Sequence, residues 1–178
     1  QVRKIKCLKK LKEKCMSANF IDIADYKTKQ LNDILLVAHQ IKSGLISPTP
    51  LLNKTIAMIF EKSSTRTRIS FEVGIKQLGG TPLVLTSNDM QLSRGETIAD
   101  TARVMSRYVD AVMIRAQSHK TLLEFKENSE IPIINGLTNV SHPCQIMADI
   151  MTIQENFNCI EGLNISWFGD SNNVLKSW

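Results

Sequence analysis

Residues 64–68, Ser-Thr-Arg-Thr-Arg, bring three hydroxyls and two guanidinium groups together directly after the apolar run Thr55–Phe60. Hydroxyls and backbone N–H groups hold phosphate oxygens, and arginine adds bidentate, charge-assisted hydrogen bonds. The glycine-rich pattern of a Walker loop is missing. An ordinary helix start, with Ser63 or Ser64 as the N-cap and two surface arginines, would explain the same residues. Arginine in a first helical turn opposes the helix dipole, however, and this favours an anion site.

Two further polar groups stand beside apolar segments. Arg115 follows the apolar run 111–114, and a His-Pro-Cys-Gln sequence from His142 to Gln145 begins a helical pattern. Proline suits the first position of a helix, so His142 becomes the cap and Gln145 follows three residues later. His142 and Gln145 can therefore face one ligand, or bond one another's backbone as a capping box. Arg115 is likewise either a ligand contact or a solvated edge residue.

A polar loop at 87–95, with Gln91 at its centre, also follows a short apolar run. Such a loop serves as a mobile lid, an oligomer contact or a plain surface loop, and the sequence leaves these open. Cys144 is not a nucleophile activated by His142, because only two residues separate them in a helical turn and no orienting group is evident.

The elements that must position these residues alternate between amphipathic helices and short apolar strands. We expect helices at 24–43, from residues 64–68 to about 78, and at 97–108, 120–127 and 143–157. We expect strands at 55–60, 83–86, 111–114, 131–134 and 163–168. This alternation predicts an α/β fold with a parallel sheet and helices on both faces. Ligands of such folds bind at the carboxyl ends of strands, where residues 64–68, Arg115 and His142 would meet.

The net charge of +5 is concentrated at the N-terminus. Residues 1–14 carry seven Lys or Arg and one Glu, so the rest of the chain is slightly acidic. A solvated tail explains this pattern, with an RNA-binding or membrane-surface patch as the alternative. No apolar run approaches the roughly 20 residues of a membrane span. We therefore expect neither nucleic acid nor a membrane as a partner.

The four cysteines show neither a Cys-x-x-Cys pair nor a histidine at zinc-finger spacing. They are expected to be free thiols of a reducing, cytoplasmic compartment, without a metal site. They are Cys7, Cys15, Cys144 and Cys159.

The expected strand at 163–168 would open a second sheet, and a polar stretch from Gly169 to Asn173 follows it. The sequence starts at Gln1 and stops at Trp178 before a further helix can develop, so we expect a fragment. The expected division is a basic tail at 1–16, one domain at 17–150, and an interdomain helix with the truncated start of a second domain at 151–178.

Three segments resemble the ornithine carbamoyltransferase branch of the aspartate/ornithine carbamoyltransferase family: FEKSSTRTRISFEVGIKQLGG, RGETIADTARVMSRYVDAVMIR and NGLTNVSHPCQIMADIMTIQE. The resemblance runs from about Phe20 to the end of the chain. The sequences Phe-Glu-Lys at 60–62, Asn-Gly-Leu-Thr at 135–138 and His-Pro-Cys-Gln at 142–145 favour the ornithine branch over the aspartate branch.

The resemblance implies a carbamoyl-phosphate-binding domain and a role for each matching residue. Arg115 and His142, with Thr67, would contact the carbamoyl oxygen, and Gln145 the amino group. Gln91 would reach a neighbouring subunit's site in a homotrimer, and Asn173 would bind ornithine. The residues that would hold the phosphate are Ser64, Thr65, Arg66, Thr67 and Arg68.

The implied reaction transfers the carbamoyl group to the δ-amine of L-ornithine, giving citrulline and phosphate. It would need no metal and no organic cofactor, and these 178 residues alone are expected to be inactive. The alternatives are an aspartate carbamoyltransferase, or an enzyme that acts on putrescine or a modified ornithine. A non-catalytic anion-binding or oligomerisation subunit is a further alternative of a different class.

Overall fold

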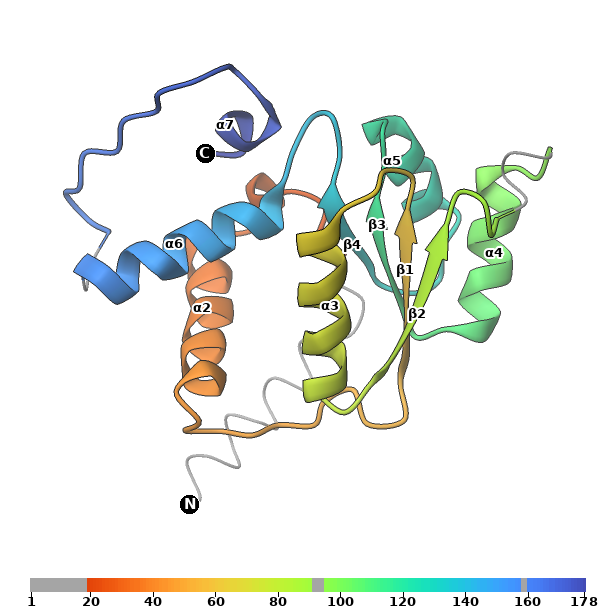
Figure 1. Ribbon diagram of the computed structural model, residues 1–178, viewed down its shortest axis with the longest axis horizontal. Coiled ribbons are helices and arrows are strands. Elements are labelled where there is room, and N and C mark those ends of the chain that lie inside the picture. Colours follow the sequence, from red (N-terminus) through yellow and green to blue (C-terminus); the bar gives the residue numbers. More distant parts are fainter. Residues whose placement is uncertain (1–18, 91–94, 158–159) are drawn as a thin grey trace.

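The computed structural model describes residues 19–90, 95–157 and 160–178 (Figure 1). The basic tail at 1–16, Gln91, and three of the cysteines (Cys7, Cys15 and Cys159) lie outside the described residues. The elements in chain order are η1 (Ile23–Asp25), α2 (Thr28–Lys42), β1 (Thr55–Phe60), α3 (Thr65–Gln77), β2 (Thr81–Thr86), α4 (Ile98–Tyr108), β3 (Ala111–Arg115), α5 (His119–Glu127), β4 (Ile133–Leu137), α6 (Pro143–Phe157) and α7 (Asn173–Ser177).

The four strands form one parallel sheet in the order β2-β1-β3-β4, which confirms the predicted α/β fold. Phe60 at the end of β1 lies opposite Thr86 of β2 and Arg115 of β3. At the outer side of β4, Phe20 pairs with the strand: its N–H donates to the Ile133 carbonyl and its carbonyl accepts from the Asn135 N–H, both at 2.8 Å. This contact covers an edge whose backbone groups would otherwise be open to other chains.

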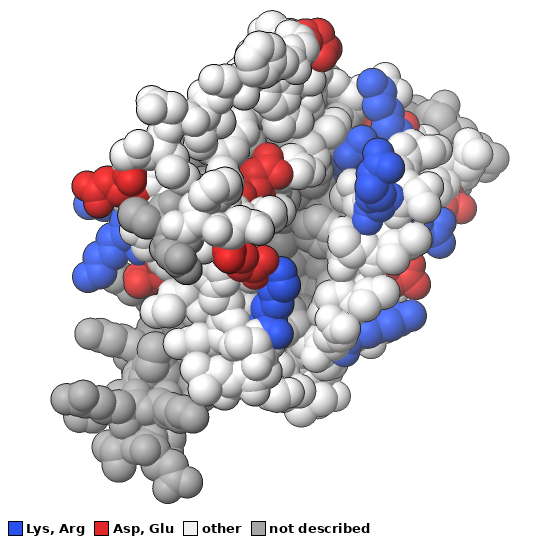
Figure 2. Space-filling model, turned by 60° about the vertical axis from the view of Figure 1, so that its left-hand side comes forward, with Lys and Arg blue, Asp and Glu red and all other residues white. Residues whose placement is uncertain are grey.

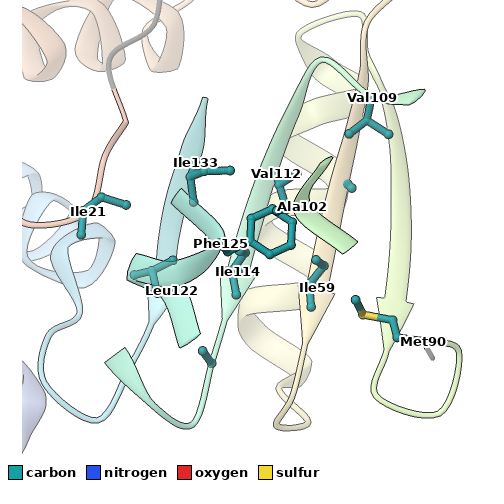
Figure 3. Close-up of a cluster of buried hydrophobic side chains, with 12 residues drawn as sticks. Ile21, Ile59, Met90, Ala102, Val109, Val112, Ile114, Leu122, Phe125 and Ile133 are labelled. Carbon is teal, nitrogen blue, oxygen red and sulfur yellow. The ribbon is translucent and has the colours of Figure 1, made fainter. Parts of the chain in front are cut away.

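The two faces of the sheet are buried by different helices. Successive strand residues point to opposite faces, so Met58 packs on the α3 side with Ile75. Ile59 packs on the other side with Ala102 of α4 and Leu122 of α5 (Figure 3). Near-continuous burial along β1, from its second residue to its last, explains the unbroken apolar run that predicted this strand.

Hydroxyl side chains begin three of the helices. Ser64, Thr97 and Ser118 are the N-caps of α3, α4 and α5, and each accepts a hydrogen bond from a backbone N–H of the first turn. Gly44 and Gly79 have φ angles of +72° and +86°, which glycine adopts without steric cost, and they follow α2 and α3 as predicted.

Three predicted elements differ from the structure by two or more residues at an end. The strand expected at 83–86 is β2, which begins at Thr81. The helix expected at 24–43 is a short η1 followed by α2, because Lys27 between them has an extended backbone (φ −74°, ψ 147°). The strand expected at 131–134 is β4, which starts at Ile133 and continues through Gly136 to Leu137.

The prediction of a strand at 163–168 is wrong. Residues 161–171 form neither helix nor strand, and their side chains are exposed, Phe168 by 94%. A strand is stable only beside a hydrogen-bonded neighbour, and none of the described strands pairs with this segment. An apolar composition cannot supply that neighbour. Within the described ranges, no helix has the length and apolarity that a membrane span requires.

Candidate functional site

The carboxyl ends of β1, β3 and β4 meet at one edge of the sheet. Arg115 lies opposite Leu137, and the register shifts just before this pair because Gly136 is an extra residue in β4. A methyl group at Gly136 would collide with Met113 Sδ and would lie 3.3 Å from the Ile114 carbonyl oxygen. Glycine therefore permits the bulge that sets the end of β4 beside Arg115.

The N-terminus of α3 opens at this edge. Ser64 Oγ accepts from the Thr67 N–H at 3.3 Å, so the capping interpretation of residues 64–68 is correct for Ser64. Capping does not account for the two arginines. Arg66 is exposed and forms no ion pair with a described residue, whereas Arg68 lies 3.7 Å from Glu72 across an exposed turn. Two cations thus stand at the positive end of the helix dipole.

Arg115 connects β3 to this helix start. Its Nη1 donates to Thr67 Oγ1 at 3.2 Å. Its Nε is buried without a partner among the described residues, and burial lowers the pKa of the guanidinium. A guanidinium only donates, so the missing partner of Nε must be an acceptor. A buried donor without an acceptor costs free energy and calls for a ligand or a water.

Glu61 holds the backbone at Arg115 and just after it. Its N–H donates to the Arg115 carbonyl at 3.0 Å, and its Oε2 accepts from the Gln117 N–H at 2.6 Å. Sequence reasoning gave Glu61 no role. Its position immediately after β1 was the available signal, because residues after a strand lie at the same edge as Arg115.

His142 stands beside Arg115. Its Nδ1 is buried without a partner among the described residues, and its backbone N–H donates to Ser177 Oγ at 2.8 Å. The pKa of His142 is lowered, first by burial and then by the positive charge of Arg115, while Asp149 opposes the shift. The imidazole is therefore neutral near pH 7.

The capping box suggested for His142 and Gln145 is wrong. The His142 N–H that it requires is donated to Ser177, and Gln145 Nε2 donates to Asp149 Oδ1 at 2.8 Å. The Gln145 side chain is exposed, and this orientation leaves Oε1 available as an acceptor. Asp149 was missed, although an acid four residues after Gln145 on a helix is a recognisable partner.

The short helix α7 contacts the segment that leads to His142. Asn173 Nδ2 donates to the Thr138 carbonyl at 2.6 Å, and Ser177 Oγ accepts a hydrogen bond from the His142 N–H. The Asn173 side chain thus bonds the segment that leads to His142, and among the described residues its side chain has no hydrogen bond to another predicted site residue. Ser177 had no sequence signal.

Cys144 is a half-buried residue with a free thiol. Its Sγ donates to the Asn135 carbonyl at 3.3 Å, and burial raises its pKa to about 12. A thiol with such a pKa is not a nucleophile near neutral pH. The sequence argument against a Cys–His pair therefore agrees with its surroundings.

Figure 2 shows one face of the molecule, with a hollow near its centre and Lys and Arg side chains grouped on the right-hand side of the hollow.

Gln91, the residue predicted to reach a neighbouring subunit, lies outside the described residues. The residues brought together at the sheet edge are Thr67, Arg115 and His142, with Gln145 one turn further along α6. We call these four residues, with residues 64–68, the sheet-edge site.

Comparison with known proteins gives the chain a family. Residues 18–155 match the model of the aspartate/ornithine carbamoyltransferase carbamoyl-P binding domain. The chain is 54% identical over 164 residues to an ornithine carbamoyltransferase of Nitrobacter winogradskyi, covering 90% of this chain and 53% of that protein. It is 55% identical over 159 residues to one of Methanosphaera stadtmanae, covering 89% and 52%.

Solved structures agree with these sequence matches. The anabolic ornithine carbamoyltransferase from Campylobacter jejuni superposes with a TM-score of 0.84 at 44% sequence identity, over 90% of this chain and 52% of that chain. The chain spans about half the length of the curated relatives that it matches.

Proposed function

This chain belongs to the aspartate/ornithine carbamoyltransferase family, and from that premise we propose that its sheet-edge site binds carbamoyl phosphate. We propose further that the protein transfers the carbamoyl group to the δ-amine of L-ornithine, giving citrulline and inorganic phosphate. The relatives named above are ornithine carbamoyltransferases, which supports ornithine over aspartate, putrescine or a modified ornithine as the amine.

The observation that carries the proposal is a pair of buried, unpartnered atoms at the sheet edge. Within the part of the chain that the structure describes, Arg115 Nε is a donor that lacks an acceptor, and His142 Nδ1 lies nearby without a partner. The Thr67 hydroxyl already accepts from Arg115, so its own proton remains to be donated. An oxygen that accepts from Arg115, Thr67 and a neutral His142 would satisfy all three groups. The carbamoyl oxygen has this chemistry.

The phosphate end of the ligand has suitable partners at the start of α3. Ser64 caps the Thr67 N–H and leaves the N–H groups of Thr65 and Arg66 without an intrahelical acceptor. Helix N-termini of this kind bind anions, and Arg66 and Arg68 add positive charge. The phosphate would lie there as the leaving group.

Gln145 would fix the orientation of the carbamoyl group. Its amide nitrogen is occupied by Asp149, so Oε1 is presented as an acceptor. The amino group of carbamoyl phosphate is a donor and matches that oxygen. Phosphate, carbonyl and amino ends of the ligand would each meet a different part of the site.

In the proposed reaction the deprotonated δ-amine of ornithine attacks the carbamoyl carbon, and negative charge develops on the carbonyl oxygen. Arg115, His142 and Thr67 would stabilise that charge; removing one such preorganised donor costs about 3–4 kcal/mol in other enzymes. The C–O bond to phosphate then breaks, and phosphate takes the electron pair and the proton that the attacking nitrogen loses. No protein nucleophile is required, because positioning and electrostatics supply the rate.

The remaining assignments are proposals on the strength of the family alone. Asn173 would bind ornithine, and Gln91 would reach a neighbouring subunit's site in a homotrimer. A cytoplasmic location would fit the unpaired thiol of Cys144. The division at 17–150 and 151–178 would separate a carbamoyl-phosphate domain from the start of an ornithine domain.

Calorimetry tests the binding step. We expect this chain to bind phosphonoacetamide, a stable analogue of carbamoyl phosphate, more tightly than inorganic phosphate, because only the analogue carries the carbonyl and amino groups. Equal affinities for the two would contradict the proposed carbamoyl contacts. Citrulline formation, assayed with ornithine, aspartate and putrescine in parallel, tests the amine in the protein that contains this chain.

A further inference from the structure

Thr138, in the segment between β4 and α6, has every polar group engaged although its side chain is fully buried. Its N–H donates to the Ser141 carbonyl at 2.9 Å, and its carbonyl accepts from Asn173 Nδ2 at 2.6 Å. Its hydroxyl accepts from the Val140 and Ser141 N–H groups, each at 3.2 Å. These bonds close a tight turn over 138–141, and His142 is the next residue.

The hydroxyl proton of Thr138 has one remaining direction. A hydroxyl offers two acceptor sites and one donor, and Val140 and Ser141 occupy both acceptor sites. The proton must therefore point to His119 Nδ1, which lies 2.9 Å away. His119 Nδ1 is then an acceptor, and the proton of its neutral ring is on Nε2.

His119 is itself held in place. It is the first residue of α5, and its backbone N–H donates to Asn139 Oδ1 at 2.9 Å. From β4, Asn135 Nδ2 donates to Ser141 Oγ at 3.0 Å. The turn is thus fixed from α5, from β4 and from its own backbone.

We propose that Thr138 and His119 are positioning residues for His142: His119 orients the Thr138 hydroxyl, which shapes the 138–141 turn and so directs His142 toward Arg115. The contact of His142 with the carbamoyl oxygen rests on the proposed function, but the coupling from His119 through Thr138 to His142 does not. The coupling is a property of the ligand-free chain.

Nuclear magnetic resonance tests the coupling without ligand. In the wild type, the imidazole nitrogen spectrum of His119 should show a proton on Nε2 and an unprotonated Nδ1 that accepts a hydrogen bond. His119→Ala should shift the ring resonances of His142, whereas His119→Asn should restore them, because the Asn Oδ1 occupies the place of Nδ1. Lys120→Ala, an exposed change on the same turn of α5, is the matched control. A proton on Nδ1, or unchanged His142 signals in His119→Ala, would overturn the proposal.

Substitutions at Thr138 separate its hydroxyl from its shape. Valine in Thr138→Val has a shape similar to that of threonine but no hydroxyl, whereas serine in Thr138→Ser keeps the hydroxyl. We expect His119→Ala and Thr138→Val to weaken phosphonoacetamide binding about tenfold or more, since each leaves buried groups unpaired. Thr138→Ser and His119→Asn should recover most of that loss. If Thr138→Val does not fold, the two His119 variants still test the positioning role.

The two proposals can fail separately. A wild type that binds no phosphonoacetamide, but whose His142 signals respond to His119→Ala, would contradict the proposed function and retain the positioning role. Tight binding that both His119→Ala and Thr138→Val leave unaltered would contradict the positioning role and retain the proposed function.

Discussion

Replacing Arg115 with methionine should weaken ligand binding without destabilising the free protein. Methionine has a similar length and no charge. Among the described residues, the Arg115 side chain makes one hydrogen bond, to Thr67, while its Nε is buried without a partner and its charge is desolvated. The native state thus carries a cost at this position that a ligand or a water would relieve.

The magnitudes follow from those contacts. Losing the bond to Thr67 removes about 1–3 kcal/mol, and removing the unsatisfied buried Nε returns a similar amount. The free energy of unfolding should therefore change by less than about 1 kcal/mol. Losing charge-assisted bonds to the ligand costs about 1.5–3 kcal/mol, which weakens binding about 10- to 150-fold.

Urea unfolding measures the first quantity, and calorimetry with phosphonoacetamide measures the second. Arg107→Met is the matched control, because Arg107 is 74% exposed on α4 and pairs only loosely with Glu130 at 3.7 Å. A third readout is the pKa of His142, which should rise in Arg115→Met because the positive charge that helps to lower it is gone. A variant that unfolds more easily yet binds the analogue with wild-type affinity would show that Arg115 is structural.

The remaining predictions concern four residues. The lowered pKa of His142 means that the unfolded chain binds this proton more readily, so the contribution of His142 to stability is present above the ordinary pKa of 6.5 and is lost as the pH falls below it. Phosphonoacetamide should raise the pKa of His142, and an unchanged NMR titration would contradict an anion beside the ring. Cys144, with its pKa raised to about 12, should react with iodoacetamide at pH 8 at least about 100-fold more slowly in the native than in the unfolded chain, as peptide mass mapping would show. Gly136→Ala should cost about 1–3 kcal/mol of unfolding free energy in urea, since the new methyl overlaps Met113; a loss below about 0.5 kcal/mol would mean that the bulge relaxes freely. Arg66→Ala, in a protein that forms citrulline, should lose about 2–3 kcal/mol of transition-state stabilisation in kcat/KM, and near-normal kinetics would exclude its phosphate role.

The sequence predicted the sheet because β1 and β3 are buried on both faces and therefore appear as unbroken apolar runs. It also predicted that Arg115 and residues 64–68 would share an edge, since parallel strands place their carboxyl ends together. The strand at 163–168 failed because the apolar pattern does not reveal whether a pairing strand exists. The capping box at His142 failed for a related reason: its N–H is taken by Ser177, a contact between residues 35 positions apart.

The partners that orient the site are harder to predict than the residues that form it. Glu61, Asp149 and Thr138 act through hydrogen bonds to backbone groups or neighbouring side chains. Their residue types alone therefore do not indicate a role in the site. Glu61 bonds Gln117, which is far away in the chain. Thr138 bonds His119 and lies within a turn whose shape is not evident in advance. Asp149, four residues from Gln145 on one helix, could have been found by spacing.

The two interpretations of residues 64–68, a helix cap and an anion site, are not alternatives in this fold. Ser64 takes the Thr67 N–H and thereby starts α3 at the carboxyl end of β1. The same turn sets the Thr67 hydroxyl against Arg115, which arrives from β3 on the face that α3 covers. Capping uses one hydroxyl and one N–H, Thr67 Oγ1 accepts from Arg115, and Arg68 pairs with Glu72. Among the described residues Arg66 has no ion pair and Arg115 Nε has no hydrogen-bond partner. The cap therefore builds the site, and the unpaired donors around it are what a phosphate and a carbonyl oxygen would satisfy.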